Sequence, residues 1–166
     1  WRDLAPALAQ HVPVWALDLP GHGFSEPAPA ATGGLPGMAE GVAQVLQGLG
    51  VGPHWIVGHS AGAAIAVRLA LDLAARRSGT ANLLGIVSLN GALRPWRGVA
   101  GQFFSPLARL LALNPVVPRL VSWRATDDVL VQRLLAGTGS SLDERGVALY
   151  RHLVADAGHV QGALAM

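Results

Sequence analysis

One serine stands in a pattern that could perform nucleophilic chemistry. Residues 58–62 read Gly-His-Ser-Ala-Gly, with an apolar run at 55–57 before them and a stretch rich in Ala and Leu at 63–75 after them. In such a G-x-S-x-G pattern the strand turns so sharply into the helix that the serine is held in a strained conformation above the sheet. We therefore predict that Ser60 projects its hydroxyl into open space as a nucleophile. The Ala61 N–H, at the start of the helix, is expected to bind an oxyanion formed beside it.

The two glycines of this pattern are expected to let the strand and the helix pass each other closely. Gly58 and Gly62 lack the Cβ atoms that would collide at such a bend. His59 occupies the variable position, and we expect it to pack against the turn or to orient it. The alternative is a glycine-rich turn in an ordinary βα unit, because 21 of the 166 residues are Gly and chance matches are easy. The strand before the pattern and the small-residue helix after it favour the nucleophile turn.

A serine hydroxyl is a weak nucleophile unless a histidine takes its proton and an acid orients that histidine. His159 could be considered as the base, but no strand precedes it and residues 145–155 have a helical pattern. The candidate acids are Asp127, Asp128, Asp143 and Asp156, and the first three are better explained by helix starts. We predict that neither base nor acid is among these residues. No His and carboxylate pair has the spacing of a metal site, and no phosphate-binding loop is present, so no metal or cofactor is expected.

The strands and helices that position Ser60 are predicted from short apolar runs and from apolar residues at helical spacing. Apolar strands are expected at 12–17, 55–57 and 83–89, separated by helices at 35–49 and 63–75. Strands that are apolar on both faces indicate a parallel sheet covered by helices on both sides. The fold class is therefore α/β.

A tight loop follows the first predicted strand. Residues 18–23 read Asp-Leu-Pro-Gly-His-Gly. Asp18 or His22 could be catalytic, because the carboxyl ends of strands line active sites in open α/β sheets. The favoured interpretation is that Asp18 shapes the loop by accepting backbone N–H bonds and that His22 is a partly exposed residue.

The chain changes character after Asn90, since residues 94–160 lack a convincing strand. Helices are predicted to start near residues 105 and 126, and a capping box at 141–144 predicts a third. This block is basic and aromatic, which suggests a cap over the site for a large, flat or greasy substrate that bears carboxylates. The residues expected to contact that substrate are Arg94, Trp96, Arg97, Phe103 and Phe104. The favoured alternative is that the aromatic residues pack the cap on the core and the arginines are solvated.

Length and composition limit the class of protein. Of the 166 residues, 51% are apolar and 13% are charged, so we expect one globular domain's worth of chain with a real core. The net charge of +2 and the lack of long basic runs argue against nucleic-acid binding. There is no cysteine for disulfide or thiolate chemistry, and no apolar stretch reaches the ~18 residues of a membrane span. Because the sequence starts at Trp1 and stops at Met166 inside an apolar segment, we expect a fragment of a longer chain.

The loop at 18–23, the pattern at 58–62 and the helical insertion together resemble the α/β-hydrolase superfamily. A narrower resemblance is to the magnesium-chelatase accessory proteins of bacteriochlorophyll biosynthesis. It rests on residues 58–64, 87–93, 104–106, 137–140 and 158–164.

The resemblance implies how the chain is divided and what it lacks. Residues 1–93 would form a partial α/β-hydrolase core, 94–160 a helical cap, and 161–166 the start of the return to the core. In this superfamily the order along the chain is Ser, acid, His. That order would place the acid and the base beyond Met166, and the second oxyanion donor would lie before Trp1.

For function, the resemblance implies a serine hydrolase that cleaves an ester or amide-type bond and is linked to the bacteriochlorophyll and magnesium-chelatase pathway. The alternative is a non-catalytic protein that uses the fold to bind a tetrapyrrole or to assist the chelatase, because fold does not settle function. An esterase of general metabolism also stays open. The implied partners are a small molecule, such as a tetrapyrrole or an ester, and the magnesium chelatase. The implied location is cytoplasmic, with peripheral membrane association left open.

Overall fold

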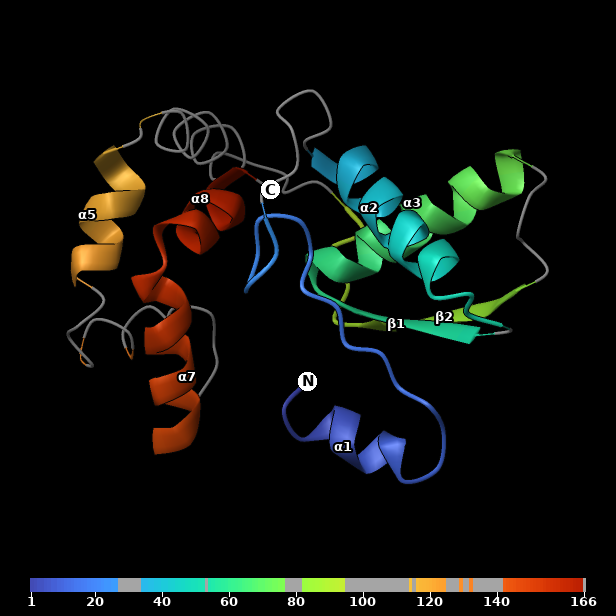
Figure 1. Ribbon diagram of the computed structural model, residues 1–166, viewed down its shortest axis with the longest axis horizontal. Coiled ribbons are helices and arrows are strands. Elements are labelled where there is room, and N and C mark those ends of the chain that lie inside the picture. Colours follow the sequence, from blue (N-terminus) through green and yellow to red (C-terminus); the bar gives the residue numbers. More distant parts are fainter. Residues whose placement is uncertain are drawn as a thin grey trace.

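The computed structural model describes residues 1–26, 34–52, 54–76, 82–94, 114, 116–124, 129, 132 and 142–165. Its elements are α1 (Leu4–Ala9), α2 (Gly34–Gly48), β1 (His54–His59), α3 (Ala61–Ala75), β2 (Leu83–Leu89), α5 (Val116–Arg124), α7 (Glu144–Ala155) and α8 (Ala157–Ala165). Figure 1 shows α2 and α3 stacked over the two strands, with α5, α7 and α8 grouped beside them.

β1 and β2 pair in parallel, which confirms the predicted arrangement of these two strands. Their carboxyl ends therefore lie at the same edge of the sheet, where His59 pairs with Leu89. Near the other end Trp55 pairs with Gly85, and a Cβ atom on Gly85 would collide with the Trp55 ring. The glycine therefore leaves room for a large indole on this face of the sheet.

The core lies between the sheet and the two helices above it. α2 and α3 pack on each other, and α3 packs on both strands. Buried Met38 of α2 meets buried Ile65 and Leu69 of α3, and Ile56 of β1 packs against this cluster. These helices present apolar residues at helical spacing, so one stripe of each is removed from water.

The second face of the sheet is open in the part of the chain that the structure describes. Trp55, Val87 and Leu89 are 61%, 39% and 37% exposed. The prediction of helices on both faces is therefore met on one face only among these residues.

The prediction of a third strand at 12–17 is wrong. The backbone of this segment pairs with neither β1 nor β2, which form a two-stranded sheet in the described ranges. A strand needs a neighbour for its N–H and C=O groups, and Pro13 lacks one donor. Val12 and Trp15 are 54% and 51% exposed, so this apolar run is not buried within a sheet. Apolar character alone did not distinguish a strand from an extended connection.

The C-terminal part consists of helices that pack on one another, α5, α7 and α8. The predicted capping box needs correction, because the N-cap of α7 is Asp143, whose Oδ1 accepts the Gly146 N–H at 2.8 Å. Ser141, the expected cap, lies outside the described residues. α5 was not predicted; it begins after Asn114, whose side-chain oxygen accepts the Val116 N–H at 2.9 Å. The helices predicted to start near 105 and 126 fall largely outside the described residues.

β1 and α3 approach each other most closely at Gly58. A Cβ atom there would lie 2.6 Å from both the N and the Cα of Ala63, which is too close for any side chain. The steric role predicted for Gly62 is wrong, since a Cβ atom there would meet no heavy atom of the described residues within 4 Å. Gly58 is therefore the position at which the absence of a side chain lets the strand run into the helix.

Replacing Gly58 tests this close passage. We expect Gly58→Ala to lower the free energy of unfolding by about 1–3 kcal/mol, because its methyl group would press on backbone that cannot move alone. Gly62→Ala is the matched control, and it should change stability by less than about 1 kcal/mol because its methyl group enters open space within a helix. Urea denaturation followed by circular dichroism measures both. Equal losses in the two variants would contradict the steric explanation.

Candidate functional site

Ser60 is the one residue between the end of β1 and the start of α3, and its backbone is unusual. It has φ 52° and ψ −122°, a region that residues with a side chain rarely adopt. Its N–H donates to the carbonyl of Leu89 at 3.1 Å, and its carbonyl accepts the N–H groups of Ala63 at 3.1 Å and Ala92 at 3.0 Å. Hydrogen bonds from the turn after β2 and from the first turn of α3 therefore hold this conformation in place.

The side chain of Ser60 takes no part in capping α3. Ser60 is exposed, and its hydroxyl makes no capping hydrogen bond to α3. Ala61 is the first residue of α3. The N–H groups of a first helical turn have no partner within their own helix, and they carry the positive end of the helix dipole. A hydroxyl and such an N–H group therefore adjoin each other at the edge of the sheet.

The turn after β2 packs against the same place. Asn90 has φ 47°. It and Ser60 are the two described residues with a side chain that have positive φ. At the next position, Gly91, a Cβ atom would lie 2.8 Å from the Cβ of Ala63 and would collide with the hydroxyl of Ser88. Both parallel strands thus end in tight turns that meet beside the first turn of α3.

Of the other residues predicted around the serine, the structure describes His59 and Arg94. His59 is the exposed last residue of β1. Arg94 is described and exposed. The remaining residues expected to contact a substrate, Trp96, Arg97, Phe103 and Phe104, lie outside the described residues.

Asp18 shapes the loop that follows the extended segment. Its Oδ2 accepts the N–H of Phe24 at 3.1 Å, and its carbonyl accepts the hydroxyl of Ser25 at 2.8 Å. Gly21 and Gly23 have φ 74° and 55°, as a tight turn of this kind requires. The geometry agrees with the favoured interpretation of Asp18 as a loop-shaping residue.

His159 contacts this loop, which the sequence analysis did not anticipate. The Gly23 N–H donates to His159 Nδ1 at 2.9 Å, across 136 residues of sequence. The ring of His22 lies edge-on to that of His159, with centroids 5.8 Å apart. Burial and the nearby His22 lower the pKa of His159, while the carboxylates of Asp156 and Asp18 act in the opposite direction. A Gly-His dipeptide does not reveal such a contact, because nothing local in the sequence specifies its partner.

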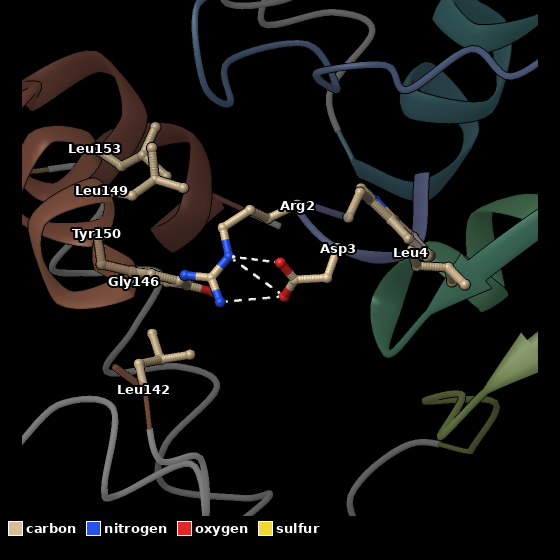
Figure 2. A pocket seen from close by; sticks show the side chains of 9 residues that line it. Arg2, Asp3, Leu4, Leu142, Gly146, Leu149, Tyr150 and Leu153 are labelled. Carbon is tan, nitrogen blue, oxygen red and sulfur yellow. Dashed lines mark hydrogen bonds and ion pairs between the residues drawn. The ribbon is translucent and has the colours of Figure 1, made fainter. Parts of the chain in front are cut away.

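A pocket of about 500 Å³ lies between α1 and α7 (Figure 2). Its wall is mostly apolar, and it is lined by Trp1, Arg2, Asp3, Leu4, Leu142, Gly146, Leu149, Tyr150 and Leu153. Neither Ser60 nor His159 contributes to this lining, so the pocket is separate from the serine turn.

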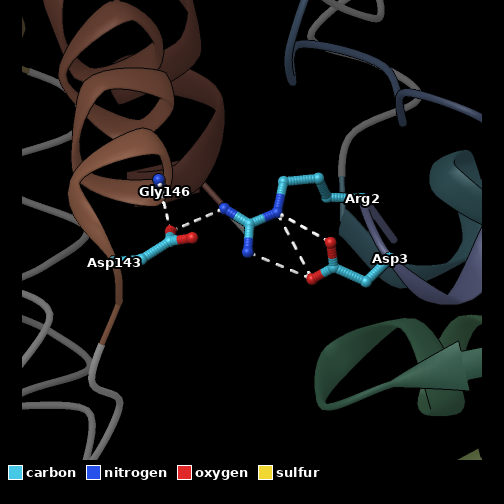
Figure 3. A network of polar contacts seen from close by, with 4 residues as sticks. All are labelled: Arg2, Asp3, Asp143 and Gly146. Carbon is cyan, nitrogen blue, oxygen red and sulfur yellow. Dashed lines mark hydrogen bonds and ion pairs between the residues drawn. The ribbon is translucent and has the colours of Figure 1, made fainter.

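Arg2 joins the two sides of this pocket through carboxylates (Figure 3). Its Nη1 donates to Asp143 Oδ1 at 2.8 Å, and its Nε donates to Asp3 Oδ1 at 3.1 Å. The hydrogen bond from Arg2, together with that from the Gly146 N–H, holds the pKa of Asp143 below its usual value. One carboxylate therefore both caps α7 and ties it to the N-terminal segment.

Within the described ranges, no three histidine or acidic side chains are grouped so that they could hold a metal ion. Each helix of the same ranges is too short or too polar to cross a bilayer.

Comparison with known proteins gave one family and several relatives. A family model described as alpha/beta hydrolase fold matches residues 1–138. The magnesium-chelatase 30 kDa subunit of Rhodobacter capsulatus is 39% identical over 166 residues, which are all of this chain and 56% of the relative. Dihydrolipoyllysine-residue acetyltransferase components of acetoin cleaving systems are 36% identical in Cupriavidus necator and 32% identical in Pseudomonas putida. Each of these matches covers 90% of this chain and 40% of the relative. The chain thus spans about half, or less, of the length of these curated relatives.

The double role of Asp143 can be separated by two substitutions. We expect Asp143→Ala to lower the free energy of unfolding more than Asp143→Asn, because asparagine keeps an oxygen for the Gly146 N–H while losing the charge that pairs with Arg2. Since the pKa of Asp143 is lowered in the fold, its contribution is present above the ordinary Asp pKa and is lost as the pH falls through the lowered value. Urea denaturation of both variants across the acidic range measures this. Equal destabilisation by the two substitutions would show that the cap contributes nothing.

Proposed function

Because the chain belongs to the alpha/beta hydrolase fold family, we propose that Ser60 is a nucleophile that attacks a carbonyl carbon in an ester or amide-type bond. The observation that supports this proposal most is the backbone of Ser60, which is held at φ 52° between β1 and α3 while its hydroxyl is left out of the helix cap. A serine that only shaped a turn would have no reason to occupy this conformation, which glycine adopts at lower cost.

In the proposed reaction, the Ser60 Oγ forms a bond to the carbonyl carbon, and the carbonyl oxygen gains the negative charge. The Ala61 N–H at the start of α3 would donate to that oxygen, where the helix dipole also favours a negative charge. Such donors stabilise the transition state because they are already in place before the charge develops. Gly58 would carry the steric requirement of this turn, because a side chain there would collide with the backbone of Ala63.

The proton of Ser60 needs a base, and we do not assign that role to the histidine nearest the loop. His159 lies in α8, and its Nδ1 already accepts the Gly23 N–H at 2.9 Å. We propose instead that the base and its acid lie outside residues 1–166. The relatives are consistent with this, because the match covers only 56% of the length of the first of them.

We also propose that residues 1–93 form part of the hydrolase core and residues 94–160 a helical cap. The described helices α5 and α7 support this division, because they pack on each other and on α8. α8 runs through residue 160, so the end of the proposed cap would lie within that helix.

The nucleophile proposal is tested with a fluorophosphonate probe on the complete reading frame. We expect the wild-type protein to be labelled and Ser60→Ala to lose the label, because the probe bonds to an activated serine oxygen. Ser88→Ala is the matched control: it removes a hydroxyl from β2 opposite Gly58, and labelling should persist. An unlabelled wild-type protein, or equal labelling of Ser60→Ala, would remove the proposal.

A second function is supported by the 39% identity to a protein named as a magnesium-chelatase subunit. In this alternative the chain keeps the hydrolase fold without catalysis and binds a tetrapyrrole or assists a chelatase. Tetrapyrroles with carboxylate groups are flat, apolar and acidic, so exposed arginines beside aromatic residues would suit them. Arg94 is exposed, and we propose that it and Arg97 bind the carboxylates.

A carboxylated porphyrin tests this alternative through the quenching of Trp fluorescence. We expect Arg94→Ala to weaken binding about tenfold, as the loss of a charge-assisted hydrogen bond would do. Arg97→Ala should have a similar effect. The matched control is Arg68→Ala, because Arg68 already pairs with Asp72 on α3 at 2.9 Å. A flat titration of the wild-type protein, or equal weakening by Arg68→Ala, would count against porphyrin binding at this place.

A further inference from the structure

The loop at residues 18–26 contacts α8 through a hydrogen bond and through a close approach of the two backbones. Its Gly23 N–H donates to His159 Nδ1 at 2.9 Å. At the opposite side of the turn, the backbone of Gly21 approaches α8 so closely that a Cβ atom on Gly162 would collide with the Gly21 carbonyl. The backbones of Gly21 and Gly162 therefore contact each other directly, and there is no room for a side chain between them. The hydrogen bond to the imidazole is a specific polar contact between the loop and α8.

That hydrogen bond defines the protonation state of the imidazole. A ring nitrogen that accepts an N–H must carry a lone pair, so Nδ1 of His159 is unprotonated and the neutral ring bears its proton on Nε2. If the ring gains a second proton, Nδ1 becomes a donor and faces the donor of Gly23. The contact then changes from attractive to repulsive.

The groups around the ring act in both directions. From the loop, His22 lies edge-on at 5.8 Å and opposes a positive charge on His159, whereas Asp18 favours one. Asp156, just before α8, also favours a positive charge on His159. Its Oδ1 accepts the backbone N–H of His159 at 2.8 Å. Burial opposes the charge most strongly, and the sum lowers the pKa of His159.

We propose that the Gly23–His159 contact is a pH-sensitive latch, which holds the loop at residues 18–26 on α8 while the imidazole is neutral and releases it when the imidazole binds a proton. This inference goes beyond the proposed function, because it requires nothing of Ser60. It concerns how the N-terminal part of the chain is connected to the helices of the proposed cap.

The direction of the pH effect follows from the lowered pKa. A histidine whose pKa is lower in the folded than in the unfolded protein stabilises the fold fully above its ordinary pKa of about 6.5. That contribution is lost as the pH falls through the lowered value. The latch is therefore closed at neutral pH and opens on acidification.

Amide hydrogen exchange read by NMR tests the latch. We expect the protection factor of the Gly23 N–H to be roughly tenfold lower at a pH below the titration midpoint of His159 than at about pH 8, because its acceptor is lost. The ¹⁵N shift of His159 Nδ1 should report an unprotonated nitrogen at the higher pH and titrate with the same midpoint. The Ser60 N–H, which donates to Leu89 at 3.1 Å, is the internal control and should keep its protection factor.

Two variants separate the latch from a general loss of structure. His159→Asn keeps an oxygen near the position of Nδ1 but cannot titrate, so the Gly23 protection factor should no longer depend on pH. His22→Gln removes the ring whose electrostatic effect lowers the pKa of His159, so the midpoint of His159 should move to higher pH. A Gly23 protection factor that is independent of pH in the wild-type protein, or that falls equally in His159→Asn, would overturn the latch. So would a protonated Nδ1 at the higher pH, which is measured without any variant.

Discussion

The candidate site depends on the way in which the backbone of Ser60 is held from two sides. One side is the missing side chain of Gly58, which lets α3 begin immediately beside the end of β1. The other is the end of β2 and the turn after it, where the Leu89 carbonyl accepts the Ser60 N–H and the Ala92 N–H donates to the Ser60 carbonyl. Strained conformations persist only where the surroundings over-determine them. Here two neighbouring parallel strands and one helix do so together, and the exposed hydroxyl is a consequence of that arrangement.

Most of this local arrangement could be predicted from the sequence, because its causes are local. The G-x-S-x-G pattern, the apolar residues of β1 and β2, and the helical periodicity of α2 and α3 each constrain a few neighbouring residues. A steric role was predicted for both Gly58 and Gly62. It holds at Gly58, because only there would a Cβ atom meet the backbone of Ala63. Residues 12–17 show the opposite case. Their apolar character resembles that of a strand, but a strand also needs a neighbour, and periodicity carries no information about neighbours.

The contacts between the two ends of the chain were beyond sequence reasoning. Arg2 reaches Asp143 across 141 residues, and Gly23 reaches His159 across 136. Both contacts are polar and lie at or near the surface, so no apolar pattern in the sequence predicts them. They join α7 and α8 to the N-terminal segment, whereas the buried residues Met38, Ile65 and Leu69 lie on α2 and α3. Exposed ion pairs contribute little to stability, so we infer that the C-terminal helices belong to the less stable part of the molecule.

The face of the sheet that the described residues leave open has a consequence for the behaviour of this chain in solution. The Trp55 indole is 61% exposed and lies over Gly85. Together with the partly exposed side chains of Val87 and Leu89, it forms an apolar surface on the two strands. Unpaired strand edges and uncovered apolar faces are the features through which β proteins associate with one another. Expression of residues 1–166 by themselves should therefore favour aggregates, and mild detergent or a charged residue in place of the indole should keep the chain dispersed.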